Sequence, residues 1–164
     1  MIEQLFIFYI ILIRVFELWL SNKNTKSLLS RGAVENYSSH YKYFVIFHVI
    51  FIVYFLNKSF RFIETNNIFY YLFFFIQIVR FLVIKELGIF WTTRIIIPDT
   101  PLIKTGIYKY LRHPNYIVVL SEVIVICLIF GDYLALAFFS IIKIILLSVR
   151  IYYEEKANAN RRRL

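Results

Sequence analysis

Apolar residues gather in five long runs along the chain, and short polar stretches separate these runs. The runs lack the alternation of a β-barrel, and isolated strands cannot cross lipid because their backbone groups would go unpaired. A bilayer core of about 30 Å needs about 20 helical residues, so the second and fourth runs are short for a crossing. The pattern predicts an all-α integral membrane bundle of about five transmembrane helices. The approximate bounds of the runs are Ile2–Leu20, Tyr43–Leu56, Ile68–Ile84, Tyr116–Phe130 and Tyr133–Val149.

Composition agrees with a membrane location. Hydrophobic residues make up 60% of the 164 residues, against about 45–50% in soluble domains, and the excess must face lipid. The length allows one membrane domain, 1–164, with N-terminal helices in residues 1–86 and a second region in residues 87–164. The first apolar run lacks the basic start of a cleavable signal, and Cys127 permits no internal disulfide.

The formal net charge of +9 predicts a topology rather than a nucleic-acid partner, because the basic residues sit in the connections between apolar runs. With five crossings, fourteen Lys and Arg residues fall on one side, against only Lys58 and Arg61 on the other. The N-terminus is therefore expected outside and the C-terminus in the cytoplasm. The fourteen are Lys23, Lys26, Arg31, Lys42, Lys85, Arg94, Lys104, Lys109, Arg112, Arg150, Lys156, Arg161, Arg162 and Arg163.

Two polar clusters stand out from the apolar background. The first is the stretch Gly106–Tyr116, GIYKYLRHPNY, and the second is Arg150–Glu155, RIYYEE. Gly131 and Asp132 favour a tight turn between the last two helices, which would then form an antiparallel hairpin. Such a hairpin would bring both clusters together at its open end, on the cytoplasmic side.

The first cluster has the chemistry of an anion site. Pro114 suits the first turn of a helix, whose free N–H groups would lie beside Arg112, His113 and Asn115. A carboxylate such as that of a methionine moiety would fit there, whereas the alternative is a membrane-interface loop with ordinary anchors. No GxGxxG follows a strand, so a Rossmann cofactor fold is excluded.

Ionisable residues within the apolar runs are costly and need partners. Arg14 and Glu17 share a helix face and are expected to form an ion pair. Glu122 either binds cofactor groups or pairs with a neighbouring cation, and Lys143 either pairs with Glu122 or snorkels. Arg80 either snorkels to the membrane surface or serves the site.

Two histidines, His40 and His48, are eight residues apart in the sequence, which is too loose for a metal pair, and no metal site is predicted. In the second cluster, Arg150 and Glu154 are four apart on a helical continuation of the fifth run. The alternative to a site role for them is a weak salt bridge on a solvated helix.

The two clusters, GIYKYLRHPNY and RIYYEEKAN, resemble the C-terminal signature of the isoprenylcysteine carboxyl methyltransferase family. The upstream LGIFWTTRIIIP is similar to a small bacterial branch that includes methyltransferases of alkylpyrones. Ile107 departs from the proline of many relatives. The resemblance covers about residues 87–157 and implies binding of S-adenosylmethionine without a Rossmann domain. The implied cofactor-binding residues are Tyr108, Arg112, His113, Pro114, Asn115, Tyr116, Glu122, Glu154 and Glu155.

The resemblance further implies that Arg150 and Glu154 are catalytic, with Arg150 facing the methyl acceptor. A carboxylate acceptor needs no base, whereas a hydroxyl acceptor would need one, and Glu154 or Glu155 could serve. The acceptor is expected to be a lipophilic small molecule or a lipidated group that enters from the bilayer. The alternative is a non-enzymatic membrane scaffold or transporter subunit, although the inverted repeats of transporters are not seen.

Overall fold

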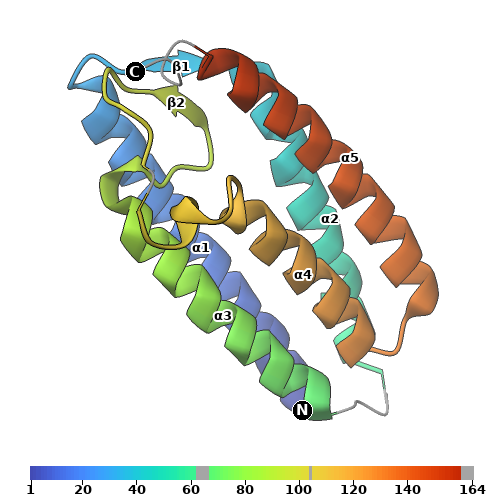
Figure 1. The fold of residues 1–164 in the computed structure, drawn as a ribbon. Helices are drawn as coiled ribbons and strands as arrows, with labels where there is room; N and C mark the ends of the chain where they lie inside the picture. The colour runs from blue at the N-terminus through green and yellow to red at the C-terminus, as the bar shows by residue number, and fades with distance from the viewer. Residues whose placement is uncertain (62–66, 104, 160–164) are drawn as a thin grey trace. The chain divides into compact units, whose positions relative to one another are not determined.

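The computed structural model describes residues 1–61, 67–103 and 105–159. In this part of the chain five α-helices follow one another (Figure 1). They confirm the predicted all-α bundle, and each corresponds to one of the five apolar runs. Most of the helices are longer than the runs because polar residues extend them at the ends. Their bounds are α1, Ile2–Leu29; α2, Tyr41–Ser59; α3, Asn67–Leu87; α4, Pro114–Ile129; and α5, Tyr133–Ala157.

Four of these helices, α1, α2, α3 and α5, are long and apolar enough to cross a membrane. The shorter α4 has 16 residues, or about 24 Å at about 1.5 Å per residue, less than the bilayer core of about 30 Å. In each of the four spanning windows, 28% or less of the residues are buried. The apolar side chains that face outward therefore need lipid, as the composition indicated.

The chain divides into two compact units that alternate along the sequence. The first comprises Met1–Phe62, Ile89–Pro101 and Arg150–Leu164, and the second comprises Ile63–Gly88 and Leu102–Val149. Helix α5 thus begins in the second unit and ends in the first. The organisation of residues 1–164 as one membrane domain stays a prediction.

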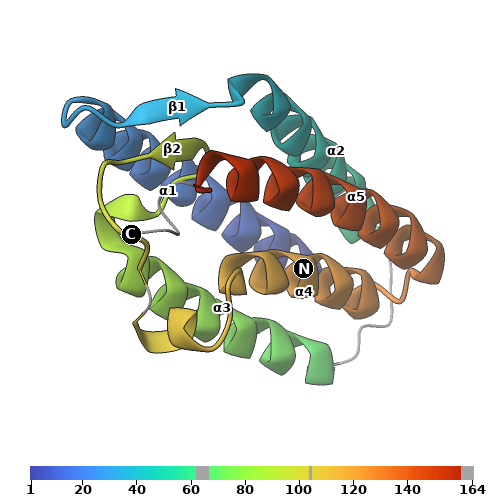
Figure 2. The same cartoon turned by 45° about the horizontal axis from the view of Figure 1, so that its top comes forward.

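In the first unit, a short antiparallel sheet ties the α1–α2 connection to the segment that follows α3. Strand β1, Val34–Asn36, pairs with β2, Ile95–Ile97, and Glu35 lies opposite Ile96 (Figure 2). Helix α1 can turn sharply toward β1 because Gly32 adopts a φ of +87°. A short 3₁₀ helix, η1, Ser38–His40, then leads into α2. The sequence did not predict this sheet.

In the second unit, α4 lies along α3 (Figure 1). Phe73 and Val83 of α3 are buried, as are Val123 and Ile126 of α4. Burial of each such apolar side chain stabilises the unit by about 1.5–3 kcal/mol. The pair α3–α4 therefore forms the rigid support for the polar stretch that precedes α4.

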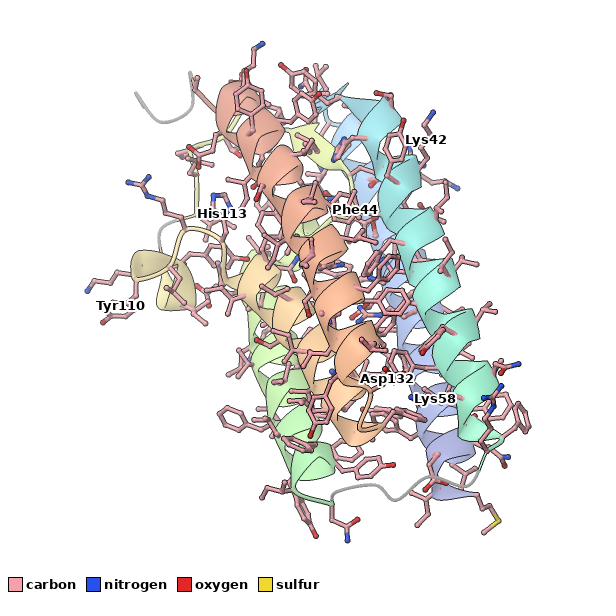
Figure 3. The ribbon with its side chains drawn as sticks, turned by 90° about the vertical axis from the view of Figure 1, so that its right-hand side faces the viewer. Lys42, Phe44, Lys58, Tyr110, His113 and Asp132 are labelled. Carbon is pink, nitrogen blue, oxygen red and sulfur yellow. The ribbon has the colours of Figure 1, made fainter. Side chains whose placement is uncertain are left out.

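The predicted turn between α4 and α5 is confirmed. Gly131 adopts a φ of +59°, and its N–H donates to the carbonyl oxygen of Leu128. The N–H of Asp132 donates to the carbonyl oxygen of Cys127, which completes a Schellman motif. The carboxylate of Asp132 then accepts from the N–H of Ala135 at 2.9 Å and caps α5. Figure 3 labels Asp132 at this turn.

Candidate functional site

The first polar cluster is anchored to the end of α3. Gly106 opens the short helix η3, Gly106–Lys109, with a φ of +51°. A Cβ atom at Gly106 would lie 2.6 Å from the carboxyl carbon of Glu86. The hydroxyl of Thr105 donates to Glu86 at 2.5 Å. Only glycine allows this close approach, which holds the turn on α3.

The turn ends where α4 begins, with the predicted proline in the first helical position. His113 is the N-cap residue in a non-helical conformation, and the described residues provide no side-chain hydrogen bond that caps this helix start. The ring of His113 stacks on Tyr116, with 5.2 Å between centroids and 13° between planes. The N–H of Tyr116 donates to the carbonyl oxygen of His113 at 3.1 Å. The positive end of the helix dipole, without a side-chain cap, lies beside the stacked aromatic pair.

Next to this helix start, the amide oxygen of Asn115 is buried and has no hydrogen-bond partner among the described residues. A buried acceptor without a partner costs about 1–3 kcal/mol, and a ligand with a donor group would remove this cost. Tyr108 and Tyr116 are half-buried, whereas Arg112 is exposed. These groups fit the two charges of a zwitterionic amino acid. The helix start suits its carboxylate, and the Asn115 oxygen suits its ammonium.

Deeper in α4, Glu122 forms a buried ion pair. Its carboxylate is 2.5 Å from the guanidinium of Arg80 and 2.7 Å from the amide of Gln77, both on α3. The expectation of a neighbouring cation is thus confirmed, and a role in cofactor binding stays a prediction. Snorkelling of Arg80 was wrong, because this side chain is buried and paired. Lys143 is also fully buried, so it does not snorkel either.

The other predicted intramembrane pair is confirmed in α1. The guanidinium of Arg14 lies 2.7 Å from the carboxylate of Glu17, which is buried. The pair lies within one helix, three residues apart, as the spacing indicated.

In the first unit, Arg150 is buried at the end of α5 rather than placed on a solvated helix. Its guanidinium donates to the carbonyl oxygen of Thr93 at 2.6 Å and lies over the ring of Phe44, 5.4 Å from the centroid. Ser21 of α1 in turn accepts from the N–H of Thr93 at 2.8 Å. These contacts fix a cation in largely apolar surroundings, where it attracts an anionic oxygen strongly.

The segment that holds Arg150 has further supports. Asn24 of α1 donates to the carbonyl oxygen of Trp91 at 2.8 Å. Arg94 reaches both carboxylate oxygens of Glu35 at 3.2 Å and covers the ring of Tyr41. Helices α1 and α2 and the β1–β2 sheet thus position residues 91–94 around the end of α5.

Glu154 and Glu155 are half-buried on the last turns of α5. The backbone carbonyl of Glu154 accepts from the N–H and the amide of Asn158, which ends the helix. Between Arg150 and Glu154 lies Tyr153, whose ring stacks on Tyr37 with 4.5 Å between centroids. The carboxylates therefore follow directly after an aromatic contact that ties α5 to the α1–α2 connection.

His40 was not predicted to be a site residue, but the structure places it in this region. The Nδ1 atom of His40 hydrogen-bonds the carbonyl oxygen of Tyr37, and its ring contacts both Phe44 and Tyr153. Its Nε2 atom is buried without a partner among the described residues. The sequence around a single histidine could not predict this placement, because the residues that contact His40 come from separate parts of the chain.

The structure divides the predicted site residues between the two units. Tyr108, Glu122 and the stretch Arg112–Tyr116 belong to the second unit, and Arg150, Glu154 and Glu155 belong to the first. The meeting of the two clusters in one pocket stays a prediction. Lys104 and Arg161, Arg162 and Arg163, which entered the charge count, lie outside the described residues.

The apolar helices, the histidine–proline turn before α4 and the arginine and glutamates near the end of α5 are features of an integral membrane protein with two polar clusters. The model of the isoprenylcysteine carboxyl methyltransferase (ICMT) family matches residues 68–160. The chain belongs to this family, and membership makes it a membrane methyltransferase. The matched residues include both polar clusters.

Two similar proteins extend the match over nearly the whole chain. The uncharacterized protein YpbQ of Bacillus subtilis is 33% identical over 158 residues, which cover 93% of this chain and 94% of the relative. An uncharacterized protein of Haemophilus influenzae is 32% identical over 155 residues, 90% of each chain. No solved structure matches the chain. The names of these two relatives give no substrate.

Proposed function

We propose that the chain is an S-adenosylmethionine-dependent O-methyltransferase that acts on a lipophilic carboxylate or hydroxyl acceptor. The observation that carries this proposal is the start of α4, where an uncapped helix N-terminus lies beside the buried, unpartnered amide oxygen of Asn115. This pairing of an anion site with a hydrogen-bond acceptor suits the amino-acid end of the methyl donor. Family membership supports methyl transfer as the reaction.

The residues of the first cluster would hold the methyl donor. The N-terminus of α4 would bind its carboxylate, Asn115 its ammonium, and Tyr108 and Tyr116 would enclose its adenosyl part. Glu154 would complete the site from the end of α5. The donor supplies an electrophilic methyl group on a positively charged sulfur. The protein therefore mainly has to align acceptor and methyl group and to exclude water.

Arg150 would orient the acceptor oxygen. Its guanidinium is buried, and its contacts with the Thr93 carbonyl and the Phe44 ring fix its position. A guanidinium held in this way can bind a carboxylate or an enolate through directed hydrogen bonds. The acceptor would enter from the bilayer, because outward-facing positions of the spanning helices are apolar, as at Leu12 and Ile145.

We place the active face in the cytoplasm and the N-terminus outside. Three basic segments support this topology, because they contact one another within the first unit. The α1–α2 connection pairs with the segment after α3 through β1 and β2, and Arg150 reaches Thr93 of that segment. Segments on the same side of a membrane that carry the excess of Lys and Arg face the cytoplasm.

Transfer of a labelled methyl group tests the function. Membranes that contain the chain are incubated with methyl-labelled S-adenosylmethionine and a total lipid extract of the producing cells. We expect label in a lipid, and we expect Asn115→Ala to lower the rate by about 10–100-fold at low donor concentration, the loss of a hydrogen bond to a charged group. Tyr110→Ala, an 80% exposed position of the same turn (Figure 3), is the matched control. A wild-type protein that labels no lipid would contradict the proposal.

A further inference from the structure

The hydrogen bond of His40 determines which ring nitrogen carries the proton. Its Nδ1 atom bonds the backbone carbonyl of Tyr37, and a carbonyl oxygen only accepts, so Nδ1 must be the donor. In the neutral imidazole the lone pair then lies on Nε2. Nε2 is buried and has no partner among the described residues, and the residue as a whole is only 7% exposed. The protein thus holds a basic nitrogen in fixed orientation, away from solvent.

The surroundings of His40 are those of the acceptor-binding arginine. His40 and Arg150 contact the same Phe44 ring, at 5.9 Å and 5.4 Å from its centroid. Tyr153, which precedes Glu154, lies 5.8 Å from the imidazole. The base and the cation are therefore held on one aromatic side chain, within one compact unit.

Backbone strain marks the same place. Tyr37 is the one non-glycine residue with positive φ in the described part of the chain, at +52°. Such a conformation costs about 1–2 kcal/mol in a bulky residue and persists only where the surroundings enforce it. Here it turns the Tyr37 carbonyl toward Nδ1 of His40 and stacks the Tyr37 ring on Tyr153. Both consequences orient His40.

We propose that His40 Nε2 is the general base of the methyl transfer to a hydroxyl acceptor. This inference rests on the proposed function, in its hydroxyl form, and assigns the base that this form requires. A carboxylate is already ionised at neutral pH and needs no base, whereas a hydroxyl must lose its proton as it attacks. A buried, oriented nitrogen with a free lone pair serves only the second acceptor. Arg150 would stabilise the developing oxyanion.

The transfer step balances with these groups. The O–H bond of the acceptor breaks, and its proton moves to His40 Nε2. The electron pair of the oxygen forms the new bond to the methyl carbon. The bond from that carbon to the sulfonium sulfur breaks, and its electron pair stays on sulfur as a neutral thioether. The proton on His40 passes to water after the products leave.

Two acceptors that differ only in acidity separate a base from a structural residue. The probes are a long-chain alkylphenol and its ring-dinitrated analogue, which is ionised at neutral pH. The variant His40→Asn keeps a donor for the Tyr37 carbonyl but lacks Nε2, and His40→Gln is a second variant in case the first does not fold. We expect transfer to the alkylphenol to fall about 100-fold or more, and transfer to the nitrated analogue to stay within about threefold.

The matched control is His48→Asn on α2, the helix that begins directly after His40. His48 also bonds a backbone carbonyl through Nδ1, that of Phe44 at 2.7 Å. We expect this variant to act on both probes like the wild type. Binding of S-adenosylmethionine, measured by titration calorimetry, is expected to be unchanged in His40→Asn, which shows that the donor site is intact.

The outcomes distinguish the inference from the proposed function. Equal loss on both probes in His40→Asn, or no loss on either, would overturn the role of His40 while methyl transfer stands. A wild-type protein that methylates N-acetyl-S-farnesylcysteine but neither phenol would overturn the hydroxyl acceptor. A wild-type protein that transfers methyl groups to no probe and no lipid would overturn the proposed function itself.

Discussion

At the scale of single residues, the intramembrane charges show how far sequence reasoning reaches. The cost of an isolated carboxylate in an apolar helix required a partner for Glu122, and the structure supplies Arg80 from α3. The identity of the partner depends on the packing of two helices far apart in sequence, so spacing alone did not identify Arg80. His40 was missed for the same reason, because Phe44 and Tyr153 become its neighbours only in the fold.

The Arg80–Glu122 pair gives a stability prediction. Glu122→Ala leaves the guanidinium buried without its carboxylate, and we expect the free energy of unfolding in detergent to fall by about 3–5 kcal/mol. The double variant Arg80→Met/Glu122→Leu removes both charges and is expected to recover most of this loss. Thermal unfolding of the three proteins measures the effect. A double variant as unstable as Glu122→Ala would show that the charges are not coupled.

At the scale of elements, hydrophobic run length predicted the helices, and Gly131 with Asp132 predicted the α4–α5 turn. The β1–β2 sheet could not be predicted, because strands of three residues leave no periodic signal. The polar turn before α4 was found by its composition. Its attachment to α3 through Glu86 and Thr105 depends on contacts that only the fold brings together.

Two glycines of the second unit isolate the effect of this attachment. Gly88 and Gly106 both have a φ of +51°, but a Cβ at Gly88 meets nothing within 4 Å, whereas one at Gly106 meets the Glu86 carboxylate. We expect Gly88→Ala to cost about 1–2 kcal/mol of stability through strain alone. Gly106→Ala is expected to cost more and also to weaken donor binding, because the turn must shift. Equal effects of the two variants on binding would contradict this role for Glu86.

At the scale of the whole molecule, the distribution of Lys and Arg predicted which connections share a side of the membrane. The contacts among the basic segments of the first unit support the prediction that these connections lie on the same side of the membrane. Sequence order and composition could not show which side chains of these segments contact one another. They located the two polar clusters but not the residues that surround them.

Thiol labelling tests the topology directly. Lys42 and Lys58 lie near opposite ends of α2 (Figure 3), and the single native cysteine, Cys127, is fully buried and gives no background. In intact cells we expect a membrane-impermeant maleimide to label Lys58→Cys. Lys42→Cys is expected to react only after lysis. The reverse pattern would place the polar clusters outside the cell.

The proposed function requires both polar clusters to bind one methyl donor. Binding of S-adenosylmethionine to purified protein in detergent, compared among wild type, Asn115→Ala and Glu154→Gln, measures this most directly. Tight binding by the wild type, weakened about 10-fold or more by each substitution, is the predicted result. A donor affinity that Glu154→Gln leaves unchanged, or a wild-type protein that binds no donor, would contradict the account.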